Sequence, residues 1–175
     1  MRPGGGWSRS LTPDTMILLP TAHAWLQDAP GSFPALMDLY ERNYIQIRRL
    51  LPDMPPATAV QVSQTPGALD LHLRIVERYP YTSELNLTYQ FDDEAGPPII
   101  EPDLCIRVYH DARQAEALTA HLRHHAAFSN DLATSGQLDR ARLYRRWRIN
   151  RFLYKWLSYC LWQGHRFIDL PSQSV

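Results

Sequence analysis

The sequence predicts an α+β domain in which an antiparallel sheet of about four to five strands packs against an N-terminal and a C-terminal helix. Three observations lead to this fold class. Apolar residues recur at three- and four-residue spacing near both ends of the body, which is typical of amphipathic helices. Between them, apolar and polar residues alternate, as they do in half-buried strands. With 175 residues and 45% hydrophobic content, the chain can bury one sizeable core, so we expect a single domain over residues 32–170.

The first helix is expected to start at Ser32, whose side chain can cap the first turn, with Pro34 in an initial position that needs no N–H partner. Pro52 should end this helix because proline cannot continue it. The stripe predicted to be buried consists of Leu36, Leu39, Tyr40, Tyr44, Ile47 and Leu51.

Strands are predicted from alternating segments after the proline-rich joint DMPPAT. Residues 59–64 (AVQVSQ) should pair across a TPG turn with the run 69–75, and the short connection ERYP then makes a hairpin with residues 81–91. An acidic loop is expected over residues 92–103, followed by a strand over 104–110. In the longest run, the side chains predicted to face inward are Tyr81, Ser83, Leu85, Leu87, Tyr89 and Phe91.

Residues 113–128 (RQAEALTAHLRHHAAF) fit two structures. The Ala and Leu content favours a helix, whereas the position after a strand and an HDAR turn favours another hairpin arm. We predict a strand followed by a loop. His121, His124 and His125 would share one face only in a helix, and no Cys or carboxylate stands close in sequence, so we predict no metal site and no cofactor.

The C-terminal helix is predicted within and after the stretch YRRWRINRFLYKW, with Gly164 as its C-cap. We expect Arg148, Arg151, Lys155 and Ser158 on its outer side. The stripe predicted to be buried consists of Ile149, Phe152, Leu153, Trp156, Leu157, Cys160 and Leu161.

Several arginines are expected at or before the start of this helix, where the helix dipole disfavours cations. They are Arg140, Arg142, Arg145 and Arg146. Their anionic partner could be internal, because Asp92, Asp93, Glu94, Glu101 and Asp103 concentrate acidic charge in the same chain. It could also be an acidic protein or an anionic ligand, held by arginines and aromatic stacking. For that case the predicted partner-binding residues are Arg142, Arg145, Arg146 and Trp147.

The overall charge is balanced, with 18 basic and 18 acidic residues, so attraction of the whole molecule to nucleic acid or an anionic membrane is not expected. Residues 1–31 are predicted to be a disordered extension and 171–175 a tail. The apolar patch from Met16 to Leu19 is too short for a membrane span. Cys105 and Cys160 are predicted to be buried thiols, which suits a reducing, cytoplasmic location.

Four segments, in order, resemble the YqiB-like family of uncharacterised proteobacterial proteins. They are LMDLYERNYIQIRRLLP, IVERYPYTSELNL, LCIRVYHDARQAEAL and RINRFLYKWLSYCLWQGH, and the resemblance covers Phe33 to Phe167. It implies a small, soluble, cytosolic protein and supplies no catalytic residues. In similar proteins the stretch after YHDAR reads as a strand, and the first thirty residues have no counterpart.

The sheet face opposite the leucines is the candidate ligand-binding surface, with Arg74, Glu77, Arg107, Tyr109 and His110 as its predicted residues. The alternative is an ordinary solvated face on which Arg74 and Arg107 pair with Glu84. His110 is also the one weak catalytic candidate, as an acid or base, while Asp111 more readily caps a turn.

Glycine-rich phosphate loops, nucleophile elbows and zinc-binding helices are missing from the sequence, so no activity is predicted from motifs. Three functions remain. We favour a binding or adaptor module for an acidic protein or anionic ligand. The alternatives are an enzyme acting on a phosphorylated or nucleotide-like small molecule and a single-stranded RNA binder, the last being disfavoured by the neutral net charge.

Overall fold

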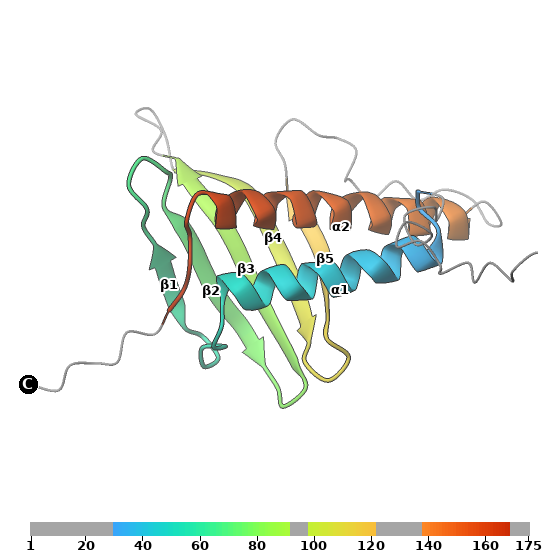
Figure 1. Ribbon diagram of the computed structural model, residues 1–175, viewed down its shortest axis with the longest axis horizontal. Coiled ribbons are helices and arrows are strands. Elements are labelled where there is room, and N and C mark those ends of the chain that lie inside the picture. The colour runs from blue at the N-terminus through green and yellow to red at the C-terminus, as the bar shows by residue number, and fades with distance from the viewer. Residues whose placement is uncertain (1–29, 92–97, 122–137, 169–175) are drawn as a thin grey trace, which may run out of the picture.

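The computed structural model describes residues 30–91, 98–121 and 138–168, which form a five-stranded antiparallel sheet with two helices on one face (Figure 1). The predicted α+β class is therefore confirmed. The elements are α1 (Phe33–Leu50), β1 (Val60–Ser63), β2 (Leu71–Arg78), β3 (Thr82–Phe91), β4 (Ile99–Tyr109), β5 (Gln114–His121) and α2 (Leu138–Trp162). The predicted extension and tail lie almost wholly outside the described residues, so the domain boundaries stay predictions.

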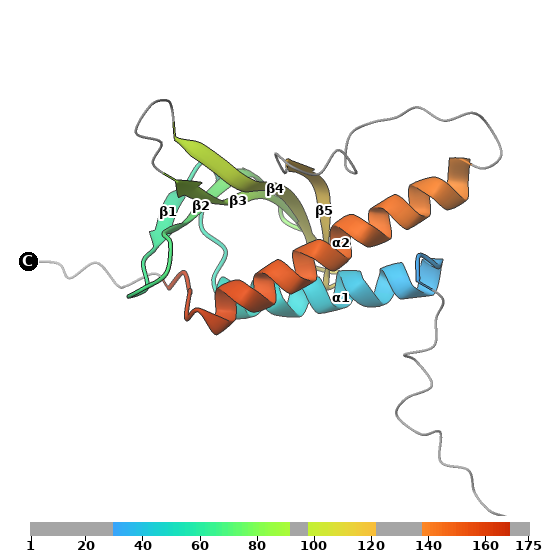
Figure 2. The same ribbon diagram turned by 90° about the horizontal axis from the view of Figure 1, so that it is seen from above.

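Each strand pairs with the next one along the chain, in the order β1-β2-β3-β4-β5. The register shifts once in each of the three longest pairings, for example between Ile75 and Glu77, and such bulges bend a sheet. Figure 2 shows the consequence, since the sheet curves around the helices. Residues 114–120 were predicted to form a strand and not a helix, and β5 confirms this prediction.

Helix α1 has the predicted start and end. The Ala35 amide donates to the Ser32 hydroxyl at 3.3 Å, and the Leu51 amide donates to the carbonyl of Ile47 at 2.7 Å just before Pro52. Its predicted stripe is buried apart from Tyr44, which is half-buried, and Asn43 is buried as well.

Helix α2 ends as predicted and begins earlier than predicted. Gly164 adopts a φ of +92°, and the His165 amide donates to the carbonyl of Cys160 at 3.0 Å, which closes the last turn. The helix extends back to Leu138, so Arg145 and Arg146 lie well inside it, away from the unfavourable end of the dipole. The expectation that they precede the helix is wrong, because helix-favouring Ala, Leu and Arg residues continue the helix upstream.

The core lies between the sheet and the helices. Trp156 is 7% exposed and meets Tyr89 edge to face, with ring centroids 5.6 Å apart. The main residues from the sheet are Leu71, Leu73, Ile75, Leu85, Leu87, Leu104, Ile106 and Val108. The main residues from the helices are Ile47, Leu50, Ile149, Leu153, Trp156, Leu157 and Cys160.

Predictions at the ends of elements need correction. Tyr81 and Phe91 are 67% and 38% exposed instead of inward, because Tyr81 lies in the β2–β3 turn and Phe91 is the last residue of β3. Residues 99–103, expected as loop, belong to β4, since Ile99 and Ile100 pair with β3. Ser158 faces α1 rather than the outer side, because its hydroxyl accepts a hydrogen bond from Gln46 at 3.2 Å.

We expect Trp156→Ala to lower the free energy of unfolding by about 3–5 kcal/mol, because it empties the space of a buried ring. Lys155→Ala, at the exposed neighbouring position of the same helix, should change it by less than about 0.5 kcal/mol. Urea unfolding followed by circular dichroism measures both. Equal losses in the two variants would contradict the packing described above.

Candidate functional site

The sheet face away from the helices carries the side chains predicted to bind a ligand. Arg107 Nε donates to Glu84 Oε1 at 2.8 Å, so these two residues form the predicted cross-strand pair. Arg74 is exposed and lies opposite Asn86, two pairs along the strands from Glu84. Arg74 and Arg107 alternate with buried core residues along their strands, so both lie on the sheet face away from the helices, and this face is the outer one because the sheet curves toward the helices (Figure 2). The two arginines therefore do not converge on a shared hollow.

Glu116 is the centre of a buried polar cluster that motif reading of the sequence missed. It belongs to β5 and is 4% exposed. Its carboxylate accepts hydrogen bonds from Tyr40 of α1 and Tyr109 of β4, each at 2.8 Å, and from Arg146 of α2 at 2.7 Å. The carboxylate thus joins both helices to the sheet.

These contacts decide the charge of Glu116. Burial alone would raise the pKa of this carboxyl, but the hydrogen bonds from Tyr109, Tyr40 and Arg146 outweigh it, and the pKa of Glu116 is lowered. Burial, together with the bond to Glu116, raises the pKa of the Tyr40 hydroxyl. Glu116 is therefore an anion at neutral pH, and Tyr40 is a neutral donor.

The cluster links the two sets of residues that were predicted separately. The bond to Glu84 is the main reason why the pKa of Arg107 is raised, and a side-chain hydrogen bond between Arg107 and Tyr109 adds to it. A polar chain therefore runs from Glu84 through Arg107, Tyr109 and Glu116 to Arg146. Arg146, which was predicted to bind another molecule, is thus paired with Glu116 of the same chain. Glu116 is not one of the acidic residues between 92 and 103 that the sequence suggested as internal partners.

Two asparagines close the outer edge of β5 next to Glu116. Asn43 Nδ2 donates to the carbonyl of Ala115 at 3.4 Å, and Asn150 Oδ1 accepts from the amide of Ala117 at 2.9 Å. Asn43 Nδ2 also lies 3.2 Å from Asn150 Oδ1, which bonds one helix to the other. Backbone groups that a further strand would otherwise pair with are thus satisfied by the helices.

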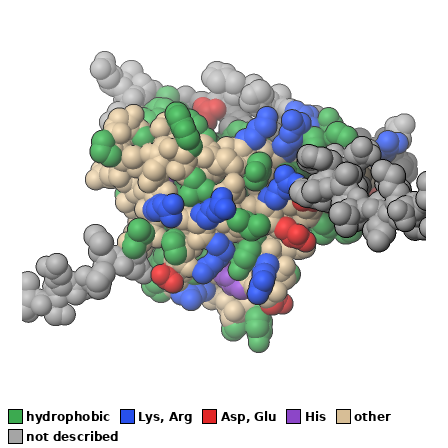
Figure 3. Space-filling view, in the orientation of Figure 1, with side chains coloured by type: hydrophobic (Ala, Val, Ile, Leu, Met, Phe, Trp, Pro, Cys, Tyr) green, Lys and Arg blue, Asp and Glu red, His purple; other side chains and the backbone are tan. Residues whose placement is uncertain are grey.

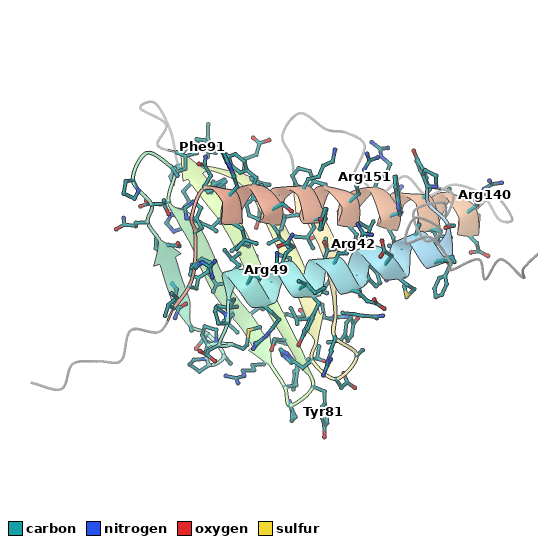
Figure 4. All side chains as sticks on the ribbon, in the orientation of Figure 1. Arg42, Arg49, Tyr81, Phe91, Arg140 and Arg151 are labelled. Atoms are coloured by element: carbon teal, nitrogen blue, oxygen red, sulfur yellow. The ribbon has the colours of Figure 1, made fainter. Side chains whose placement is uncertain are left out.

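The outer surface of the helix layer is basic. Helix α1 contributes three arginines and two acidic residues, and α2 contributes six arginines, one lysine and one acidic residue. Figure 3 shows Lys and Arg side chains spread over the face that carries the helices, and Figure 4 labels Arg42, Arg49, Arg140 and Arg151 along them. The balanced total charge therefore conceals a strongly uneven distribution.

Aromatic side chains stand among these arginines. Tyr144 and Trp147 stack with ring centroids 5.8 Å apart, and the guanidinium carbon of Arg151 lies 5.1 Å from the Trp147 ring centroid. Arg142 and Arg151 are exposed, and Arg145 and Trp147 are partly exposed. Of the four predicted partner-binding residues, Arg142 and Trp147 thus lie on the surface, while Arg146 is committed to Glu116.

His110 lies at the end of β4, away from Arg74. Its Nε2 is 2.8 Å from the hydroxyl of Ser83, which is completely buried. Asp111 accepts from the Ala112 amide at 2.8 Å, in agreement with its predicted turn-capping role. Glu77 lies opposite Glu84 and accepts a hydrogen bond from Tyr79, and so borders the same end of the sheet. The predicted ligand-binding residues therefore lie in two places, on the outer sheet face around Arg107 and at the end of β4 around His110.

The described residues leave some predictions untested. His124, His125 and the acidic residues Asp92, Asp93 and Glu94 lie outside them. Within the described ranges, no three side chains of the metal-ligating types come together, and neither helix is long and apolar enough to cross a bilayer.

Comparison with known proteins finds relatives of this chain. The family model described as "Protein of unknown function (DUF1249)" matches residues 46–166. "Uncharacterized protein YqiB" of Escherichia coli strain K12 is 34% identical over 139 residues, which cover 75% of this chain and 90% of that protein. The proteins of the same name from strains O6:H1 and O157:H7 match to the same extent. No solved structure is significantly similar.

Glu116→Gln should make the stability of the protein less dependent on pH. The pKa of Glu116 is lower in the folded than in the unfolded chain, so its stabilisation is complete above the unfolded value of about 4.3 and is lost as the pH falls through the folded value. Urea unfolding between pH 7 and pH 3 should therefore show a steeper loss for the wild type. Parallel curves would contradict the ionised cluster.

Arg146→Gln should lower the free energy of unfolding by about 1–2 kcal/mol, because it removes one charged donor from a buried carboxylate while both tyrosines remain. The side chain of Arg146 is itself partly exposed, which keeps the loss moderate. Arg142→Gln, one turn away and exposed, is the matched control and should be nearly silent in the same unfolding assay. A silent Arg146→Gln would show that the contact does not stabilise the fold.

Proposed function

The chain belongs to the DUF1249 family of proteins of unknown function, and we propose that it is a binding module whose helix layer recognises an acidic protein. The observation that carries this proposal is the uneven charge of the molecule. Basic side chains outnumber acidic ones on α1 and α2, although the chain as a whole is neutral. Such a face steers and orients a negatively charged partner without making the whole molecule cationic.

The proposed contact surface is the outer side of α2 around Trp147. Arg140 and Arg151 supply charge there, because they stand seven residues before and four residues after Trp147 and so lie on its side of the helix. The stacked Tyr144 and Trp147 supply a rigid aromatic contact of the kind that dominates many interfaces. Arg146 bonds to Glu116 and thereby fixes the position of the helix that carries the other residues. It thus has a positioning role in the proposal instead of a direct contact.

The alternative functions receive less support. A catalytic role for His110 would need an accessible group for it to activate, and its hydrogen-bond partner Ser83 is completely buried. Stacked aromatics among arginines also suit single-stranded RNA, so RNA is a defined outcome of the test. We further propose a cytoplasmic location, because Cys105 and Cys160 are both free thiols.

The test uses a double variant, Arg140→Glu with Arg151→Glu, and a matched control, Arg74→Glu, which reverses an exposed charge on the opposite face. A partner is first identified by capture and mass spectrometry, and its purified acidic region is then titrated against each protein by calorimetry. The double variant should bind at least about tenfold more weakly, a loss of about 1.4 kcal/mol, while its melting temperature stays unchanged. The control should bind as the wild type does.

Two results would overturn this proposal. Equal weakening by Arg74→Glu would mean that the helix layer is not the specific surface. Tight binding of an oligonucleotide, with an affinity that falls by about one power of the salt concentration for each phosphate contact, would replace the acidic protein with RNA.

A further inference from the structure

Four elements meet at one corner of the molecule, below the helices in Figure 1. Arg78, the last residue of β2, donates through Nη1 to the carbonyls of Met54 at 2.7 Å and Pro55 at 3.1 Å, in the segment that follows α1. The same arginine lies directly opposite Ser83 of β3 in the strand register. Its guanidinium is therefore held in place beneath the C-terminal end of α1, on the helix-bearing side of the sheet.

His110 completes this corner from the end of β4. Its amide donates to the carbonyl of Tyr81 at 2.8 Å, and its Nε2 is held by the buried Ser83 hydroxyl. Both its backbone and one ring nitrogen are thus fixed. Within the described part of the chain, the other ring nitrogen, Nδ1, makes no hydrogen bond. When Ser83 donates to Nε2, Nδ1 carries the proton and is a free donor.

The charge around this imidazole is predominantly positive. The pKa of His110 is lowered first by burial and then by the nearby charges of Arg48 and Arg78, with the exposed Asp111 as the one opposing charge. Figure 3 shows several Lys and Arg side chains on this face of the molecule. Two guanidinium charges against the single carboxylate of Asp111, beside a half-buried imidazole, leave a local excess of positive charge.

We propose that this corner binds a phosphoryl group, with Arg48, Arg78 and His110 as its ligands. Arg78 keeps most of its N–H donors after bonding the two carbonyls, and Arg48 is exposed on the last turn of α1. Guanidinium donors match phosphate oxygens in geometry, and a third donor from the imidazole suits the tetrahedral shape of the anion better than a flat carboxylate. Binding of the anion offsets the repulsion between the two guanidinium groups.

The protonation of His110 makes this binding dependent on pH. The groups that face the imidazole are Arg48 from α1, Arg78 from β2, Ser83 from β3 and Asp111 after β4. A bound anion favours the imidazolium, so bound phosphate should raise the pKa of His110. This site does not rest on the proposed function, because it uses none of the residues around Trp147.

The test follows the His110 ring by NMR during titration with inorganic phosphate and, in a parallel series, with chloride at equal ionic strength. We expect a dissociation constant on the order of 1 mM and an upward shift of the His110 titration midpoint in phosphate only. Arg48→Gln should weaken binding about tenfold, whereas Arg49→Gln, the adjacent exposed arginine on the same helix end, should not. Phosphoserine and a nucleoside monophosphate, titrated in the same way, identify the carrier of the phosphoryl group.

Two results would contradict the proposed phosphoryl-binding site. The proposal is overturned if the His110 signals stay unmoved in phosphate, or if Arg49→Gln weakens binding as much as Arg48→Gln, which would indicate unspecific screening. The double variant Arg140→Glu with Arg151→Glu should retain phosphate binding, so a negative result here leaves the acidic-protein proposal untouched.

Discussion

The structure depends on the ionised carboxylate of Glu116, buried where both helices meet the edge of the sheet. An isolated charge there would be costly, so its three donors must be in place whenever the chain is folded. Those donors come from α1, β4 and α2, which are far apart in sequence. Hydrophobic packing brings the helices onto the sheet, and this cluster fixes how far along the sheet each helix sits.

The same cluster explains the outward charge of the helix layer. Arg146 is drawn inward by Glu116, and its neighbours on the outer side of α2 remain in solvent beside Tyr144 and Trp147. A helix held only by its apolar stripe could rotate by several degrees without great cost. Helix α2 is also held by the hydrogen bonds of Arg146 and Asn150 to β5, so its outer residues keep a single orientation. A selective contact with another molecule requires such a fixed orientation.

Most of the fold could be predicted from the sequence because its signals are local. Alternation in residues 71–75 and 82–89 and the cap at Ser32 depend on neighbours within a few positions, and each appears in the structure. The polar cluster could not be predicted in this way. Glu116 stands alone among alanines, and Asn43 and Asn150 interrupt apolar stripes. These three anomalies are the signals available in the sequence, but apart from Tyr109, which is 7 residues from Glu116, their tertiary partners are 30 to 107 residues away.

The corner around His110 was missed for the same reason. No feature near Arg48 or Arg78 in sequence indicates that their charges act on His110 after β4, since only the hairpin order and the placement of α1 bring about this arrangement. The resemblance to relatives supported the order of the elements. It could not indicate which side chains would be close in space.

The asparagine pair at β5 has a consequence for how copies of this protein meet one another. Of the two outermost strands of the described sheet, β5 has the carbonyl of Ala115 and the amide of Ala117 bonded to helix side chains, and β1 has four residues. Strand-by-strand growth into ribbons or fibrils needs a long open edge. A concentrated solution of this chain therefore offers few places where such growth can begin.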